Sequence, residues 1–343
     1  MNRHLSYDDV LLRPQYSDIE SRSEIDVSSD LGKGVLLRVP VIASPMDTVS
    51  ESTMASAMAE GGGAAIVHRY NTIDEQCKHI TMATIREGSP MPNLVGAAIG
   101  VSGDYLERAR AVYEAGANFL CVDVAHGHHR MMKESLSQLR AIFGEKIHLM
   151  AGNVATLTGI NDLADWGADS VRCNIGGGSI CSTRIQTGHG LPGLQTILDC
   201  AQTDRDVKII ADGGIKNSGD IVKAIAAGAD AVMVGSLLAG SMESPGELLY
   251  EDGCRWKVYR GMASKEAQLK WRGTYSSLEG VSSRVPYRGP VADILDELDR
   301  GIRSGFSYSG ARNLKNFQAK AEFVQQTNSG LVESRTHINH RNW

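Results

Sequence analysis

Residues 207–236 read VKIIADGGIKNSGDIVKAIAAGADAVMVGS, two apolar runs on either side of a helical pattern. The runs at 207–214 and 231–236 are apolar without polar alternation, as in strands that are buried on both faces of a sheet. Between them, residues 218–227 space their apolar side chains along one face of a helix. The stretch therefore predicts a strand, a crossover helix and a second, parallel strand, which is one βαβ unit of an α/β fold.

The same kind of run recurs along the chain before this unit. Six further apolar runs occur, at 39–44, 64–68, 94–100, 119–126, 147–153 and 170–176. Eight successive βα units over about 200 residues favour a closed (β/α)8 TIM barrel over the alternative, a doubly wound open sheet. We therefore expect one TIM-barrel domain over residues 1–343, with no internal linker.

Composition and charge exclude several classes of function. The 343 residues carry a net charge of −5 and no basic tract, which gives no electrostatic reason to expect nucleic acid as a partner. No apolar run approaches the roughly 20 residues of a membrane span, and the beginning MNRHLSYDDV lacks the apolar core of a signal peptide. The six cysteines form no CxxC pair. We expect a cytoplasmic protein with no membrane partner.

Polar residues and glycines follow nearly every predicted strand. They form the clusters SPMDTVSE, HRY, DVAHGHH, AGNVAT, GGGSICST, ADGGI and the GS at 235–236. In a barrel all of these lie at the carboxyl ends of the strands, where barrel enzymes have their active sites. Three histidines in HGHH resemble a metal cluster, but no acidic or cysteine pair matches them, so hydrogen bonding is the favoured interpretation.

The loops after the seventh and eighth strands are the candidates for binding phosphate. Glycines at such turns expose backbone amides, and a following helix adds the favourable end of its dipole. The phosphate candidates are Gly213, Gly214, Gly235 and Ser236, and Asp212 can accept hydrogen bonds from a ribose. The alternative to a phosphate site is that these glycines only form the turns after the strands and bind no ligand.

The run GGGSICSTR, residues 176–184, surrounds one cysteine with glycines and hydroxyl groups. Such a setting suits a reactive thiol better than a core, so Cys181 is the candidate nucleophile. Thr183 can relay a proton but needs a carboxylate partner, which the local pattern leaves open. The carbonyl groups of Gly176 and Gly178 are free to face a cation.

Nine ordered motifs together resemble the IMP dehydrogenase and GMP reductase family nearly from end to end. They are LSYDDVLLRP, IASPMDTVSE, VDVAHGHH, MAGNVAT, GGGSICSTR, IADGGI, VGSLLAG, YRGMAS and IRSGFSYSGARN. The resemblance implies a TIM barrel, GMP or IMP held by its phosphate, a nicotinamide cofactor and a homotetramer. It also implies that Cys181 attacks purine C2, with Thr183 beside it.

The resemblance assigns further residues motif by motif. It implies that the substrate contacts are Ser44, Met46, Asp212, Gly213, Gly214, Gly235, Ser236, Tyr259, Gly261 and Met262. It implies that Asp123 and Asn153 face the cofactor, and that the carbonyls of Gly176, Gly178 and Cys181 bind a potassium ion. The chain departs from the family at Asn174 and Gly177, and it has no tandem CBS insert between the second and third strands.

The segment 263–285 distinguishes the two activities of the family. Dehydrogenases carry a long flap with an adjacent Arg-Tyr pair that activates water, whereas here Arg272 and Tyr275 are separated in a short flap. This resembles the reductase, in which Glu279 pairs with Thr183 and protonates the departing ammonia. We expect a GMP reductase that uses NADPH.

Two alternatives stay open beside the reductase. The tail 329–343 resembles that of the dehydrogenases, so an IMP dehydrogenase that makes XMP with NAD is the main alternative. A nucleotide-binding barrel without catalysis is a further one, although the intact Cys181 speaks against it.

Overall fold

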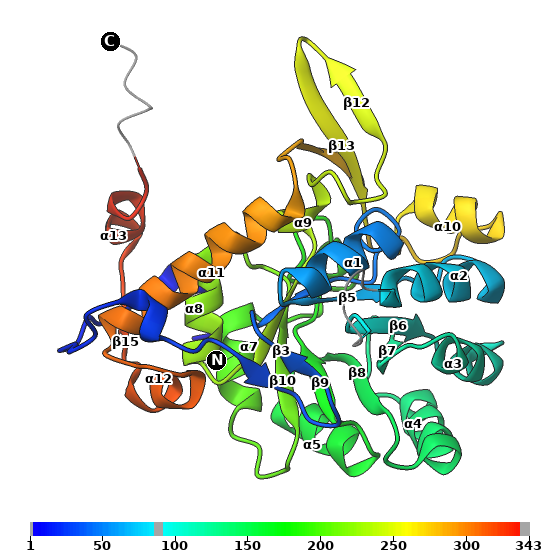
Figure 1. The fold of residues 1–343 in the computed structure, drawn as a ribbon, viewed down its shortest axis with the longest axis horizontal. Coiled ribbons are helices and arrows are strands. Elements are labelled where there is room, and N and C mark those ends of the chain that lie inside the picture. Colours follow the sequence, from blue (N-terminus) through cyan, green and yellow to red (C-terminus); the bar gives the residue numbers. More distant parts are fainter. Residues whose placement is uncertain (1–2, 86–91, 337–343) are drawn as a thin grey trace.

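The computed structural model describes residues 3–85 and 92–336. Eight parallel strands close into a barrel in the order in which they occur along the chain, and the last pairs with the first (Figure 1). They are β4 (Val41–Ala43), β5 (Ala64–Val67), β6 (Val95–Ile99), β7 (Phe119–Asp123), β8 (His148–Val154), β9 (Ser170–Cys173), β10 (Lys208–Asp212) and β11 (Ala231–Val234). Seven lie within one of the eight apolar runs and β8 extends one residue beyond its run, so the predicted (β/α)8 barrel is confirmed.

Helices cover the outside of the barrel. They are α1 (Ser52–Glu60), α2 (Ile73–Thr84), α3 (Tyr105–Glu114), α4 (Arg130–Phe143), α5 (Leu157–Asp165), α7 (Gly193–Cys200), α8 (Ser218–Ala226) and α11 (Val291–Tyr308), with the short α6 (Thr183–Thr187) and α9 (Ser236–Ala239). All of them except α9 and α11, which follow β11, lie between successive barrel strands. In α8 the apolar face predicted from the sequence is buried, and the side chain of Asn217 caps its first turn by accepting the amide of Asp220.

A small hairpin packs against the amino ends of the barrel strands. It consists of β2 (Ser29–Asp30) and β3 (Leu36–Leu37). Its apolar side chains Leu31, Val35 and Leu37 are buried in one cluster with residues of the barrel interior, including Phe119 and Ala231 at the starts of their strands. The hairpin therefore fills that end of the barrel with hydrocarbon.

The remaining elements lie outside the barrel. A three-stranded antiparallel sheet of β12 (Leu248–Glu251), β13 (Cys254–Arg260) and β14 (Ser282–Pro286) projects from it, and α10 (Lys265–Arg272) connects the last two strands (Figure 1). The other elements are η1 (Tyr7–Asp9), β1 (Val10–Leu12), η2 (Arg22–Glu24), α12 (Leu314–Lys320), β15 (Phe323–Gln325) and α13 (Asn328–Glu333).

Two segments named in the sequence analysis occupy these outer parts. The predicted flap, 263–285, contains α10 and most of β14. The predicted tail, 329–343, begins inside α13, and its residues 337–343 lie outside the described residues. Within the described ranges, no helix combines the length and apolar character that a membrane crossing requires.

Candidate active site

A cavity of about 350 Å³ opens at the carboxyl ends of the barrel strands. Every residue that the sequence assigns to the site lines it: Ser44, Met46, Asp123, Asn153, Gly176, Gly178, Cys181, Thr183, Asp212, Gly213, Gly214, Gly235, Ser236, Tyr259, Gly261, Met262 and Glu279. The fold thus brings the predicted residues together, whereas their individual roles stay predictions.

The loop after β9 and the end of the flap meet at Cys181. The thiol of Cys181 donates to Thr183 Oγ1 over 3.2 Å, and the Thr183 hydroxyl donates to Glu279 Oε2 over 2.8 Å. The hydroxyl of Ser277 donates to the other carboxylate oxygen over 2.9 Å. A thiol, a hydroxyl and a carboxylate therefore form one continuous hydrogen-bonded chain, which is a path for a proton.

Backbone hydrogen bonds fix this arrangement. The amide of Ser182 donates to the carbonyl of Glu279 over 2.9 Å, and the amide of Val281 donates to that of Ile180 over 3.0 Å. The two segments lie antiparallel, with Cys181 opposite Gly280. The position of the carboxylate beside Thr183 is thus set by main-chain pairing as well as by side chains.

The other end of the cavity is shaped by the absence of a side chain at Gly235. A Cβ atom there would lie 2.7 Å from Tyr259 Oη, 3.2 Å from Met46 Sδ and 3.5 Å from Ser44 Oγ. Burial raises the pKa of Tyr259 to about 12, so its hydroxyl keeps its proton and can donate it in a hydrogen bond to an anion. Gly235 leaves open the space in front of this donor.

Gly213 and Gly214 form the turn after β10, with φ angles of +85° and +77°. Only glycine adopts such angles without strain. A Cβ at Gly213 would lie 3.3 Å from the amide nitrogen of Gly178, and one at Gly214 would lie 3.3 Å from the carbonyl oxygen of Gly177. The turn after β10 and the cysteine loop therefore pack backbone against backbone.

Sequence reasoning missed Arg172, a buried residue of β9 that lines the cavity. Its guanidinium donates to Asp212 Oδ2 over 2.8 and 3.0 Å and also pairs with Asp123. Asn153 donates to the same oxygen of Asp212 over 2.7 Å. Burial alone lowers the pKa of Arg172, but the neighbouring negative charges outweigh it and raise the pKa, so the guanidinium stays charged.

These contacts leave Asp212 with one carboxylate oxygen for a ligand, because no hydrogen bond among the described residues uses Oδ1. The sequence does contain one indication of a role for Arg172, because it is a single charged residue within the apolar run SVRC. Burial of such a charge requires partners, and the partners are two of the predicted site residues.

Arg69 and Tyr70 after β5 also line the cavity without having been assigned a role. Arg69 donates to the carbonyl of Asp123 over 3.2 Å, and its Nε lies 3.8 Å from a carboxylate oxygen of the same residue. This Nε atom is buried and has no hydrogen-bond partner among the described residues. A polar donor therefore remains available on the β5 side of the cavity.

The cysteine loop already contacts one cation of the protein itself. Arg184 donates to the carbonyl of Ile175 over 3.2 Å, to Asn174 Oδ1 over 3.3 Å and to the carbonyl of Leu191. The carbonyl of Gly178 accepts the amide of Cys181 over 3.1 Å. Carbonyl oxygens are suitable ligands for a potassium ion, but one of the predicted ligands, the carbonyl oxygen of Gly178, thus already accepts a hydrogen bond.

Two of the three histidines of HGHH make ordinary polar contacts. His128 pairs with Asp162 over 2.7 Å, and Nδ1 of His129 accepts the amide of Met131 at the start of α4. Within residues 3–85 and 92–336, no group of three histidine, cysteine or acidic side chains is placed to hold a metal ion.

The two flap residues expected of a dehydrogenase do not line the cavity. Arg272 donates to the carbonyl of Thr274 over 3.2 Å and to Ser276 Oγ over 2.9 Å. The ring of Tyr275 is half exposed and faces the ammonium of Lys265 at 5.0 Å. Both side chains thus interact within the flap.

Comparisons with known proteins agree with this architecture. The family model described as the IMP dehydrogenase / GMP reductase domain matches residues 4–337. Inosine-5'-monophosphate dehydrogenase of Nitrosopumilus maritimus is 35% identical over 466 positions, covering 97% of this chain and 98% of the relative. GMP reductase of Leishmania major is 32% identical, covering 97% and 96%.

A solved structure shows the same fold at full length. It is a cysteine-to-alanine variant of GMP reductase from Trypanosoma brucei in complex with guanosine 5'-monophosphate, with a TM-score of 0.93, 31% identity and 98% of each chain covered. The alignment of 466 positions exceeds the 343 residues of this chain by 123, so the Nitrosopumilus relative carries at least 123 residues that have no counterpart here. The chain belongs to the IMP dehydrogenase / GMP reductase family.

Proposed function

We propose that the protein is a GMP reductase that converts GMP to IMP and ammonia, with NADPH as the source of hydride. The observation that carries the proposal is the hydrogen-bonded chain from Cys181 through Thr183 to Glu279, with Arg272 and Tyr275 away from the cavity. The chain supplies a proton beside the nucleophile, as a departing amine requires.

The first step is attack by the thiolate of Cys181 on C2 of GMP. The glycines at the β10 and β11 ends and the hydroxyl of Tyr259 bind the phosphate, while Asp212 Oδ1 accepts from the ribose. Because these groups fix the far end of the nucleotide, the purine C2 is directed to Cys181. The thiol proton passes through the Thr183 hydroxyl to Glu279, and as the C2–S bond forms the π electrons of the C2=N3 bond move to N3.

The second step releases ammonia. Glu279, acting through the hydroxyl of Thr183, delivers a proton to the exocyclic nitrogen of GMP. The C2–N2 bond breaks, the electron pair leaves with ammonia, and the purine stays bonded to Cys181 with a C2=N3 double bond. The hydrogen bond from Thr183 to Glu279 gives the proton a direct path from the carboxyl group towards the leaving nitrogen.

A reduced nicotinamide supplies the hydride that C2 then requires. Residues that fit such a ligand lie on the β5 to β7 side of Cys181, where Asp123 and Tyr70 line the wall and the buried Arg69 Nε, apart from its ion pair with Asp123, has no hydrogen-bond partner in the described part of the chain. After C2 has gained the hydride, the C2–S bond breaks, Cys181 leaves as a thiolate and IMP is released.

Hydrolysis, which a dehydrogenase needs, has less support in the site. An IMP dehydrogenase must activate water at C2 after the redox step, and the arginine and tyrosine that could do so lie within the flap. The dehydrogenase stays the second candidate because relatives of both activities match at similar identity, 35% and 32%.

The experiment is a paired assay of the purified protein. With GMP and NADPH we expect a fall in NADPH absorbance matched by released ammonia in a ratio of one to one. NADH in place of NADPH tests the choice of cofactor in the same assay. No ammonia from GMP, together with XMP formed from IMP and NAD, would replace the reductase by the dehydrogenase.

Three further properties belong to the same proposal. We expect a homotetramer, activity in the cytoplasm, and a potassium ion bound by carbonyl groups of Gly176, Gly178 and Cys181. Light scattering tests the first, and replacement of potassium by sodium in the ammonia assay tests the last. A lone subunit at assay concentration, or equal rates in both salts, would remove the corresponding expectation.

A further inference from the structure

Helix α10 of the flap contacts the barrel through two stacked aromatic rings. The ring centres of Trp271 and Tyr70 are 4.2 Å apart, and the ring planes differ by 10°. The guanidinium of Arg69 lies 5.6 Å from the ring centre of Tyr70 and 6.0 Å from that of Trp271. Stacking and cation–π attraction both favour this contact. It joins a segment of the flap to the loop after β5.

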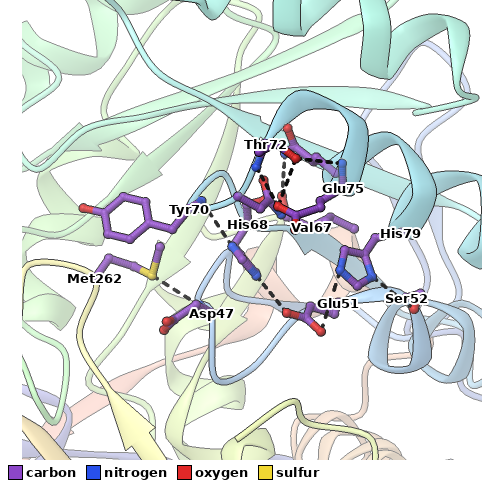
Figure 2. Close-up of polar contacts among 12 residues, drawn as sticks. Asp47, Glu51, Ser52, Val67, His68, Tyr70, Thr72, Glu75, His79 and Met262 are labelled. Atoms are coloured by element: carbon purple, nitrogen blue, oxygen red, sulfur yellow. Dashed lines mark hydrogen bonds and ion pairs between the residues drawn. The ribbon is translucent and has the colours of Figure 1, made fainter. Parts of the chain in front are cut away.

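The barrel side of this contact is held by a buried histidine. Figure 2 shows His68 between Tyr70 and Glu51. His68 Nδ1 accepts the amide of Tyr70 over 3.2 Å, and Nε2 lies 3.1 Å from Glu51 Oε1. Because Nδ1 accepts, the proton is on Nε2 and points at the carboxylate. The backbone of Tyr70 is thereby fixed relative to the start of α1.

A second attraction acts between the same two parts. Burial raises the pKa of Glu51, but His68, His79 and Lys270 of α10 outweigh it and lower the pKa, so the carboxylate is ionised. The negative charge of Glu51 thus attracts Lys270, which precedes Trp271 in α10. The aromatic contact and this charge hold α10 in one place.

Inside the flap, the buried Gln268 ties α10 to the returning chain. Its side-chain nitrogen donates to the carbonyls of Ala263 and Ser277 over 3.1 and 3.0 Å, and its oxygen accepts the amide of Ser276 over 3.1 Å. Ser277 in turn donates to Glu279. A displacement of α10 is therefore carried to the carboxylate beside Thr183.

We infer that the Tyr70–Trp271 stack is a positioning contact that holds the flap so that Glu279 meets Thr183. Trp271 does not line the cavity, so it acts through the flap and not on a ligand. The kinetic part of this inference rests on the proposed reductase, in which Glu279 serves the release of ammonia and not the binding of GMP. Loss of the stack thus slows the release of ammonia and leaves the binding of GMP intact.

The experiment compares Trp271→Ala with Trp271→Phe in single turnover with GMP and NADPH. We expect the alanine variant to release ammonia about 10-fold more slowly, as loss of a ring stack predicts, and the phenylalanine variant to recover most of the rate. The Kd for GMP, from calorimetry, stays unchanged in both. Leu269→Ala, at an exposed position of the same helix, is the matched control and keeps the wild-type rate.

A Glu279→Gln background makes the test specific. If Trp271 acts through Glu279, Trp271→Ala lowers the residual rate no further in that background. An equal further loss there, or an alanine variant with wild-type ammonia release, would overturn the inference.

A second readout is independent of the reaction. Hydrogen exchange of the amides at 274–281 should become faster in Trp271→Ala, while exchange at 207–214 stays the same. If the wild type forms no ammonia, the proposed function fails, and the exchange result alone decides about the stack. Unchanged exchange in the flap would disprove the positioning contact in either case.

Discussion

The two ends of the barrel use different residues for different purposes. At the carboxyl ends of the strands, glycines, a thiol and charged side chains surround an open cavity. At the amino ends, the β2–β3 hairpin buries Leu31, Val35 and Leu37 against the strands. The first end has polar groups available to a ligand and the second has a packed apolar cluster. We therefore expect substitutions to affect activity at one end and stability at the other.

The largest difference between the effect on activity and the effect on stability is expected for a substitution of Cys181. Cys181→Ala removes the atom that bonds to C2, so ammonia release should fall by at least about 10⁴-fold, while the free energy of unfolding stays nearly the same. The ammonia assay and urea unfolding measure the two quantities. Cys254→Ala, at an exposed cysteine, is the control and should keep full activity. Substantial turnover in Cys181→Ala would remove the nucleophile from the mechanism.

Glu279→Gln should have the next largest effect. The amide keeps the shape of the side chain but cannot supply the proton, so ammonia release should fall by about 10² to 10⁴-fold with little change in the Kd for GMP. Glu266→Gln, an exposed carboxylate of the same flap, is the matched control. A wild-type rate in Glu279→Gln would mean that the proton comes from elsewhere, whatever the geometry at Thr183.

The barrel itself could be predicted from the sequence because its signals are local. Each strand is a short apolar run such as 207–214, and a polar turn follows it, so the pattern within a few residues fixes both the element and the end at which the cavity opens. The closeness of Glu279 to Thr183 had no such local signal, since the two are 96 residues apart. It was predicted only through resemblance to the family.

The residues that were missed depend on contacts that no local pattern encodes. Arg172 lies within an apolar run, and its importance becomes visible only when β7 and β10 bring Asp123 and Asp212 to it. The hairpin of β2 and β3 has strands of two residues each, too short for a periodicity to be recognised. The stack of Tyr70 on Trp271 likewise joins segments that are far apart in the sequence.

The amino end can be tested with two neighbouring leucines of β3. Leu37 is fully buried, so Leu37→Ala should lower the free energy of unfolding by about 2 to 5 kcal/mol. Leu36 points outward and is 56% exposed, so Leu36→Ala should have almost no effect. Both variants should release ammonia at the wild-type rate below their unfolding temperature. A loss of activity in Leu37→Ala but not in Leu36→Ala would show that packing at the amino ends of the strands affects the reaction at the carboxyl ends.

The pH dependence of stability gives a second test at the amino end. His148, the first residue of β8, is buried against Ser170, and burial lowers its pKa to about 4. In the unfolded chain the ordinary pKa is about 6.5, so below that pH the unfolded state takes up a proton that the folded state does not. The stabilising contribution is complete above pH 6.5 and is lost as the pH falls towards 4.

Urea unfolding measures this loss directly. Between pH 7 and pH 5, titration of His148 should lower the free energy of unfolding by about 2 kcal/mol. His148→Asn should remove that part of the pH dependence, whereas His189→Asn, at an exposed histidine, should keep it. If the free energy of unfolding depends on pH equally in the wild type and in His148→Asn, the loss of stability between pH 7 and pH 5 comes from other titrating groups.

The smallest effect is expected where the carboxyl end relies on the absence of a side chain. In Gly235→Ala the new Cβ meets Tyr259 Oη at 2.7 Å, and relief of such a contact costs about 1 to 3 kcal/mol. The tyrosine must move from the proposed phosphate site, so the Kd for GMP should rise about 10-fold, whereas binding of guanosine, which lacks the phosphate, should change little.

Tyr259→Phe separates steric from polar effects in the same site. It removes the oxygen that the new Cβ would meet, so the loss in Gly235→Ala/Tyr259→Phe should be smaller than the sum of the two single losses. Calorimetry with GMP and guanosine completes the cycle. If the binding of GMP and of guanosine weakens equally in Gly235→Ala, the contact affects the shape of the whole cavity. The phosphate must then bind elsewhere at the carboxyl ends of the strands.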